Sequence, residues 1–415
     1  MNENKRMTSP APEAAYRIDV AEAARLIDEH MPTYGSQLVP LEDAEGCILR
    51  QTVTAEREQP PYDRVTMDGV AIDSAALARG LREFTLAGNQ AAGEAALRLP
   101  ATGTCIEIMT GAVLPIGADT VIPIERIERK TDRVILEAGY EATPGQFIHA
   151  RGSDHAKGLP LLEPGVRIRA PEMAILTVAG SATVEVAEWP KLAVISTGDE
   201  LIEVGQPVEA YQIRSSNDRA IQATFRARGC HHSVRAHLPD EPQRLLQRIG
   251  DLHEQTDVLI LSGGVSMGKY DYVPGVLEKL GVQLVFHKVL QRPGLPMWFG
   301  VSQIGKPVFA LPGNPVSTLV CVIRYALPAL LQAMGMRARA NEYVVLGDAV
   351  EFEPDLTWFL PVKLASDAGK PARALPRPTN TSGDFISLSD SSGFVELQRG
   401  QNRYEAGLNV PFYRW

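Results

Sequence analysis

The chain has 415 residues, a length that suits roughly two to four domains, and its formal net charge of −9 without a basic tract argues against nucleic acid as the main partner. Its four cysteines are scattered without C-x-x-C spacing, which suits a reduced cytoplasm and indicates no zinc site. No apolar run approaches the roughly 18 residues of a membrane span and the first ten residues lack the apolar centre of a signal peptide, so we expect a soluble, cytoplasmic protein without a membrane partner.

The first half of the chain predicts one helix and then a β-rich segment. Apolar residues at helical spacing predict the helix over residues 20–30. The proline-bearing stretch 59–63 breaks the chain, and short alternating strands separated by glycine and proline turns follow it up to about residue 150. These strands predict a β-rich domain of about 90 residues. A helix at 171–179 and a strand at 183–186 then precede a domain boundary at Pro190.

After Pro190 strands and helices alternate regularly, which predicts a mostly parallel sheet with helices on both faces. The expected strands are 192–196, 233–238, 257–261 and 282–290, with a hairpin formed by 298–301 and 307–311. The expected helices are 218–228, with Asn217 as its cap, 242–253, one that begins near Pro274, and a long apolar helix from about 315 to 334. From about residue 341 the strands become short again and predict a small all-β domain.

The stretch 257–275 is the centre of this pattern, because it predicts a buried strand, a glycine turn and a helix. In the turn, Ser262, Gly263 and Gly264 are small enough for a ligand to touch backbone N–H groups. Open α/β sheets bind anions at such a place. The spacing from Gly263 to Lys269 fits G-x-x-x-x-G-K, but Tyr270 stands where a Walker loop needs Ser or Thr for Mg²⁺, so an ordinary nucleotide-triphosphate hydrolase is not expected.

Acidic side chains follow three strands of the α/β segment at Glu200, Asp240 and Asp271. Strand ends of a parallel sheet collect on one edge, where carboxylates would repel one another unless a cation such as Mg²⁺ lay among them. The alternative is that each acid caps a helix or lies in a solvated turn.

Basic side chains at Lys288 and Arg292 belong to the same segment, and cations beside a metal edge are typical of phosphoryl chemistry. Gly313-Asn314-Pro315 offers a further anion position, or equally a plain helix start with proline in its first turn. The histidines supply no general base, and no nucleophile elbow is present in the sequence.

Six motifs occur in the order found in molybdopterin molybdenumtransferases, the bacterial relatives of the gephyrin E domain, and from about residue 19 to the C-terminus the chain resembles that family. The motifs are Met-Asp-Gly-Val-Ala at 67–71, Met-Thr-Gly-Ala at 109–112, Ser-Thr-Gly-Asp-Glu-Leu at 196–201, Ser-Gly-Gly-Val-Ser-Met-Gly at 262–268, Gln-Arg-Pro-Gly at 291–294 and Leu-Pro-Gly-Asn-Pro at 311–315.

The resemblance implies Mg²⁺-dependent insertion of molybdate into adenylylated molybdopterin, with release of AMP and molybdenum cofactor. It implies a multidomain α/β protein: a discontinuous linking domain (1–57 plus 150–188), a β-rich inserted domain (58–149), a central molybdopterin-binding domain (189–336) and a C-terminal β-barrel-like domain (337–415). It also implies a homodimer whose active cleft is built from both subunits, and it suggests molybdopterin adenylyltransferase as a protein partner.

Residue by residue, the resemblance makes Asp68 and Thr110 the contribution of the second subunit to catalysis, beside Glu200, Asp240 and Asp271 around the metal and pyrophosphate. The remaining positions that it assigns to substrate binding are Arg151, Asp154, Ser262, Gly263, Gly264, Ser266, Lys288, Arg292, Pro312, Gly313, Asn314, Pro315 and Ser382.

Two departures from the family pattern reduce the positive charge of the expected oxyanion site. Leu295 stands where relatives often carry Lys, and the stretch 355–361 lacks arginines that many relatives have there; Lys363 and the turn 380–383 are candidate replacements. Two other functions are an adenylyltransferase, whose α/β domain is similar, and a non-catalytic scaffold. The β-rich insertion and the terminal β domain argue against the first, and retention of the strand-end acids argues against the second.

Overall fold

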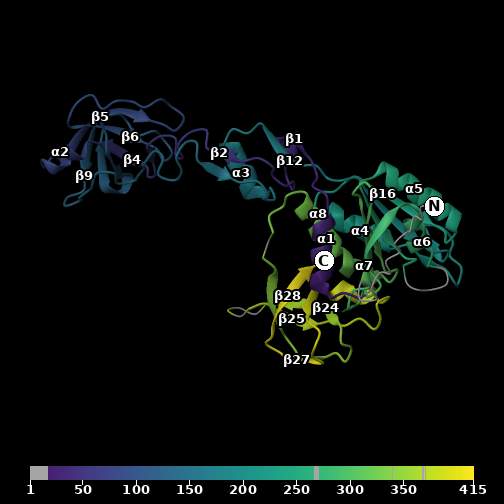
Figure 1. Cartoon of the computed structure of the whole chain (residues 1–415). Helices are drawn as coiled ribbons and strands as arrows, with labels where there is room; N and C mark the ends of the chain where they lie inside the picture. Colours follow the sequence, from purple (N-terminus) through teal and green to yellow (C-terminus); the bar gives the residue numbers. More distant parts are fainter. Residues whose placement is uncertain (1–16, 266–270, 339, 367–368, 370) are drawn as a thin grey trace, which may run out of the picture.

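The computed structural model describes residues 17–265, 271–338, 340–366, 369 and 371–415. Figure 1 shows an elongated molecule. A β-rich unit lies at one end, a narrow linking unit follows, and an α/β unit lies at the other end beside a small barrel that carries the C-terminus. The multidomain α/β architecture predicted from the sequence is therefore confirmed.

The β-rich unit is a six-stranded sheet in the order β7-β4-β6-β5-β9-β8. Its strands are β4 (Gly69–Ile72), β5 (Glu83–Gln90), β6 (Thr104–Ile108), β7 (Thr120–Pro123), β8 (Ile127–Lys130) and β9 (Arg133–Leu136), with one short helix, α2 (Ser74–Ala78). The first residue of β4 must be glycine, because a Cβ at Gly69 would lie 1.9 Å from the carbonyl oxygen of Ile122.

The linking unit is made by the chain before and after the β-rich unit. Strand β1 (Ser36–Pro40) pairs with β12 (Thr183–Ala187), β2 (Val53–Thr54) with β11 (Pro160–Leu162), and β3 (Arg64–Val65) with β10 (Ile148–His149), all antiparallel. Helix α3 (Ala170–Val178) packs on this unit. Helix α1 (Val20–His30) instead places Val20, Ala23 and Ile27 in the core of the α/β unit. The exact domain boundaries remain a prediction.

The α/β unit contains a six-stranded sheet in the order β16-β13-β17-β21-β20-β18. Strands β13 (Leu192–Thr197), β16 (Ser233–Leu238), β17 (Val258–Ser262) and β21 (Pro307–Leu311) are parallel, while β20 (Trp298–Ser302) runs antiparallel to β21 and to β18 (Val282–His287). The mostly parallel sheet is thus confirmed. The expected strand 282–290 ends at His287, because residues 291–292 form a separate strand, β19 (Gln291–Arg292), that joins the barrel.

Both faces of this sheet are covered, which explains the nearly continuous apolar strands. Val194 and Ile260 face one core with α4 (Asn217–Arg226), whereas Ala193 and Leu259 face a second core with α5 (Pro242–Gln255) and α6 (Val273–Lys279). Successive side chains of a strand point to opposite faces, so each strand feeds both cores.

The last helix of the α/β unit runs through α7 (Pro315–Cys321), a π-helical turn at Val322–Ala326 and α8 (Leu327–Ala333). By length and composition this segment is long and apolar enough to cross a membrane, although the expectation from the sequence was that no such segment exists. However, 72% of its most apolar window is buried inside the protein, as in the core helix of a globular unit.

The C-terminal unit is a closed barrel, because the sheet β24-β25-β22-β28-β26 returns to β24 through the β24–β26 pairing. Its strands are β22 (Glu342–Leu346), β24 (Thr357–Ala365), β25 (Arg373–Pro376), β26 (Gly393–Leu397) and β28 (Asn409–Arg414). Strand β19 extends it from the α/β side by parallel pairing with β24. The predicted small β-barrel is confirmed, and its attachment to β19 places it beside the edge where the α/β strands end.

Candidate functional site

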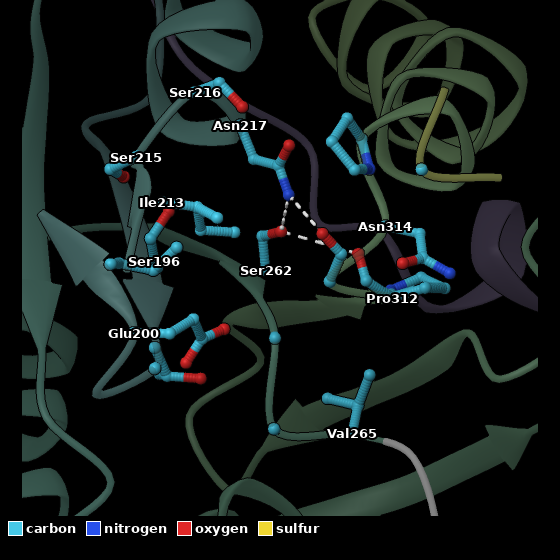
Figure 2. A pocket seen from close by; sticks show the side chains of 18 of the residues that line it. Ser196, Glu200, Ile213, Ser215, Ser216, Asn217, Ser262, Val265, Pro312 and Asn314 are labelled. Carbon is cyan, nitrogen blue, oxygen red and sulfur yellow. Dashed lines mark hydrogen bonds between the residues drawn. The ribbon is translucent and has the colours of Figure 1, made fainter. Parts of the chain in front are cut away.

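A cavity of about 700 Å³ lies where the parallel strands β13, β17 and β21 end. Its walls come from the segments that leave these strands, from the start of α4 and from a loop of the barrel. Figure 2 shows the Asn217 side chain pointing to Ser262, with Pro312 and Asn314 beside them and Glu200 across the cavity. In open α/β sheets, ligands bind in the crevice outside the carboxyl ends of the strands, and this cavity lies at that edge.

The glycine turn after β17 forms part of the cavity wall. Gly263 has a φ of 100° and Gly264 a φ of 66°, which side chains rarely allow. A Cβ on Gly263 would lie 2.6 Å from the carbonyl oxygen of Thr197, and one on Gly264 would lie 2.8 Å from Cγ2 of Val273. Only glycine fits both positions, because the turn packs closely on Thr197 and Val273 while it lines the cavity. Gly263 is buried and its backbone nitrogen donates to the carbonyl oxygen of Leu311 at 3.1 Å, whereas Gly264 is half-buried.

A hydrogen-bonded group ties the turn to the neighbouring strand ends. The Asn217 amide nitrogen donates to Ser262 Oγ at 2.8 Å, to the carbonyl oxygen of Gly313 at 2.7 Å and to Thr318 Oγ1 at 3.2 Å. The sequence had suggested Asn217 as a helix cap, and this is wrong: Ser216 takes the capping position and Asn217 is the first residue of α4. Its amide instead fixes the cavity wall, a role for which the sequence carried no signal.

Two hydroxyl groups of the cavity wall are buried without a hydrogen-bond partner among the described residues. They are Ser196 Oγ and Thr197 Oγ1, at the end of β13. Buried polar atoms are nearly always paired, so an unpaired pair of hydroxyls in a cavity indicates a place for a polar ligand. Both belong to a motif noted in the sequence, but their burial could not be read there.

The three strand-end acids Glu200, Asp240 and Asp271 all line this cavity. Burial raises the pKa of Asp240, and the negative charges of Asp199, Glu200 and Asp271 raise it further. Among the described residues, no group of three or more His, Cys, Asp or Glu side chains is arranged to hold a metal ion. The acids thus share one cavity and one electrostatic field, while the metal site itself stays a prediction.

The segment Pro312–Gly313–Asn314–Pro315 lines the same cavity, and its residues Pro312 and Asn314 also line a smaller one. Asn314 Nδ2 donates to Ser382 Oγ at 2.6 Å, which fastens a barrel loop to the start of α7. Ser382 and Arg292 both line the adjoining cavities, of about 190 and 330 Å³. The larger of these shares Pro296, Pro312 and Asn314 with the main cavity. The cavity that Arg292 lines therefore adjoins the cavity that the three acids line.

Comparison with known proteins agrees with this arrangement. Family models match three consecutive regions: the MoeA N-terminal region (domain I and II) over residues 18–180, a probable molybdopterin binding domain over 193–332, and the MoeA C-terminal region (domain IV) over 343–415. A molybdopterin molybdenumtransferase of Synechocystis is 38% identical over 399 residues, covering 96% of this chain and all of the relative. The chain belongs to the molybdopterin molybdenumtransferase family.

Other relatives point the same way. A molybdopterin molybdenumtransferase of Bacillus subtilis is 29% identical, covering 95% of this chain and 93% of its own. Two crystal structures of molybdopterin biosynthesis MoeA protein from Pyrococcus horikoshii superimpose with TM-scores of 0.78 and 0.80, at 30% and 26% identity, and each covers 96% of this chain. The resemblance recognised from the six motifs, and with it the classification as a transferase, is confirmed.

Several residues that the family resemblance assigns to the site lie away from the cavity in this chain. Asp68 Oδ1 accepts hydrogen bonds from the backbone nitrogen and Oγ1 of Thr110, at 2.6 and 2.7 Å, and these bonds lower the pKa of Asp68. Both residues belong to the β-rich unit at the other end of the molecule (Figure 1).

Arg151 and Asp154 lie between the linking and β-rich units. Arg151 pairs with Glu58 at 3.0 Å, and Asp154 with His149 at 2.8 Å. Lys288, at a φ of 73°, lines neither the main cavity nor the two adjoining ones. Ser266, together with Lys269, falls outside the residues that the structure describes.

Proposed function

We propose that the main cavity binds adenylylated molybdopterin and that the chain inserts molybdate into it, releasing AMP and molybdenum cofactor. The observation that carries this proposal is a cavity at the carboxyl edge of a parallel sheet, lined by the glycine turn Gly263–Gly264, two residues with unpaired buried hydroxyls and three acids. Such an edge suits a phosphate-bearing ligand, because backbone N–H groups and hydroxyls donate to phosphate oxygens.

The polar wall would hold the ligand's phosphates. Ser196 and Thr197 have hydroxyl donors without partners, and the half-buried Gly264 brings backbone without a side chain to the cavity wall. Asn217 would act indirectly: its amide already donates to Ser262 and Gly313, so it keeps the two strand ends at a fixed separation. A fixed set of donors stabilises phosphate charge without having to reorganise during the reaction.

We further propose that Glu200, Asp240 and Asp271 hold Mg²⁺ when the substrate is bound. Burial and three negative neighbours raise the pKa of Asp240, and a bound cation would offset their repulsion and favour the ionised carboxylate. Mg²⁺ usually takes one or two carboxylates, and water and substrate phosphates complete its shell. The absence of a three-ligand group among the described residues is therefore compatible with this role. When bound, the ion would neutralise charge on the phosphates.

The acids that would hold the cation also repel a free oxyanion, so molybdate needs a separate positive approach. Arg292 lines both adjoining cavities. Glu351 is the one carboxylate among the described residues that line them. We propose that molybdate enters beside Arg292 and meets the pterin at the shared wall of Pro312 and Asn314. A planar guanidinium suits a tetrahedral oxyanion, since it donates through two parallel N–H groups.

We also propose that the active form is a homodimer with a shared cleft. No described residue of the β-rich unit lines the main cavity, and Asp68 and Thr110 lie at the far end of the elongated chain. If these two residues take part, a second copy must bring them. The chain's four cysteines are unpaired, which supports a reduced, cytoplasmic location.

The test is incubation of the purified protein with adenylylated molybdopterin, molybdate and Mg²⁺, with AMP and active cofactor measured together. Both products should appear in equal amounts, EDTA should stop their formation, and added Mg²⁺ should restore it. Full turnover in chelator would remove the metal from this account. Adenylylation of molybdopterin from ATP without cofactor formation would favour the adenylyltransferase, and binding without turnover would favour the scaffold.

A further inference from the structure

Behind Arg292, a fully buried glutamine holds the turn that carries it. Gln291 has no exposed surface. Its Nε2 donates to the carbonyl oxygen of Pro293 at 3.1 Å and lies 3.5 Å from Sγ of Cys321. The side chain therefore reaches over Arg292 and fastens the backbone on its far side. A side chain that bonds to the backbone two residues on restricts the dihedral angles between the two points.

The other end of the same amide is held by a tyrosine. Tyr325 Oη donates to Oε1 of Gln291, from the π-helical turn at Val322–Ala326. Tyr325 is 2% exposed, and burial raises the pKa of its phenol, which keeps the hydroxyl protonated as a donor. Since the amide accepts at one end and donates at the other, it has a single orientation and cannot swing away from Pro293.

The turn packs so closely on this amide that it admits no side chain at the next position. Gly294 has a φ of 98°. A Cβ there would lie 2.5 Å from Nε2 of Gln291 and 2.7 Å from Sγ of Cys321. Gly294 thus packs directly on the Gln291 amide, and Tyr325 holds the other end of that amide.

The residue before Tyr325 ties the same π-helical turn to the barrel. Arg324 Nε donates to Glu396 Oε2 at 2.8 Å, and Tyr413 Oη donates to the same oxygen at 2.8 Å. Glu396 and Tyr413 belong to barrel strands β26 and β28. Two consecutive residues of one π-helical turn therefore hold the barrel and the Arg292 turn, between which the cavities lie. Such turns occur frequently at functional sites.

We propose that Tyr325 and Gln291 are positioning residues for the oxyanion substrate: the buried phenol–amide pair aims Arg292 into the cavities beside the barrel. The inference rests on the proposed function, in which Arg292 contacts molybdate. Since Leu295 is apolar, Arg292 is the one cation between Gln291 and Leu295, and the charge of this turn depends on the aim of that arginine. Losing the fixed backbone would spread Arg292 over several orientations, and binding would then have to select one of them.

The experiment compares two matched variants of the full-length protein, Tyr325→Phe and Tyr413→Phe. Each removes one tyrosine hydroxyl and one hydrogen bond, the first from Gln291 and the second from Glu396. Isothermal titration with sodium molybdate and steady-state KM values for molybdate and for adenylylated molybdopterin are measured beside Tm. We expect Tyr325→Phe to raise the molybdate Kd and KM about tenfold, with kcat and the nucleotide KM nearly unchanged. Tyr413→Phe should lower Tm to a similar extent and leave the molybdate KM within about twofold.

A rise in molybdate KM that follows Tm in both variants would overturn the positioning role, because a merely structural effect predicts it. So would an unchanged molybdate KM in Tyr325→Phe when Arg292→Ala weakens molybdate strongly. If Arg292→Ala itself leaves molybdate binding unchanged, the proposed contact fails and the positioning role fails with it. The two failures are therefore distinguishable.

Discussion

Substitution of Gly263 by alanine tests whether the glycine turn is as tightly constrained as its geometry indicates. The added Cβ would lie 2.6 Å from the carbonyl oxygen and 2.9 Å from Oγ1 of Thr197, at a φ of 100°. Unfavourable backbone dihedrals cost about 1–3 kcal/mol and overpacking a rigid core costs about 1–3 kcal/mol, so we expect a loss of about 3 kcal/mol. For a unit of roughly 150 residues this lowers Tm by about 6–12 °C.

The control is Gly275→Ala, the same substitution in the helix that follows the turn. Gly275 lies within α6 with nothing within 4 Å of its Cβ position, so alanine should stabilise the helix by about 0.5–1 kcal/mol. Thermal unfolding followed by circular dichroism, with calorimetry, measures both variants. Equal Tm values for the two variants would refute the claim that Gly263 packs too closely on Thr197 to admit a side chain.

Three further predictions concern the acids. Asp271→Asn should fold normally and lose most AMP release, and unchanged release would remove its assigned role. Mixing the inactive Asp68→Ala and Asp271→Asn proteins should restore about one quarter of wild-type activity. Half of the randomly formed dimers are mixed, and each mixed dimer holds one intact cleft of two. No activity in verified mixed dimers would contradict the shared cleft. The pKa of Asp240 is raised in the folded state, so ionisation of this carboxyl lowers the free energy of unfolding as pH rises from the unfolded pKa of about 3.9 to the folded pKa. Asp240→Asn has no such ionisation, and its stability relative to wild type should therefore increase over the same pH range. A stability difference that does not change with pH, measured by denaturant unfolding, would argue against this shift.

The elements that were predicted correctly are those whose signal is local. The strand 257–261, its glycine turn and the helix after it are encoded by neighbouring residues, and the structure has β17, Gly263 and α6 there. The motifs identified the family for the same reason, since six short matches in order need no tertiary information. Asn217 was misassigned because an asparagine at a helix start is typical of a cap, whereas its partners Ser262 and Gly313 are 45 and 96 residues away.

The sequence by itself determined the α/β order of the central unit, the glycine turn and the family, because hydrophobic period, turn chemistry and motif spacing all act over a few residues. Only the tertiary structure decided that strands near residues 36–54 pair with strands near 160–187, and that β19 leaves the sheet to join the barrel. It also decided that Gln291 and Tyr325 meet beneath Arg292. Pairings of this kind depend on burial and hydrogen-bond partners supplied from distant parts of the chain, and no local pattern records which partner arrives.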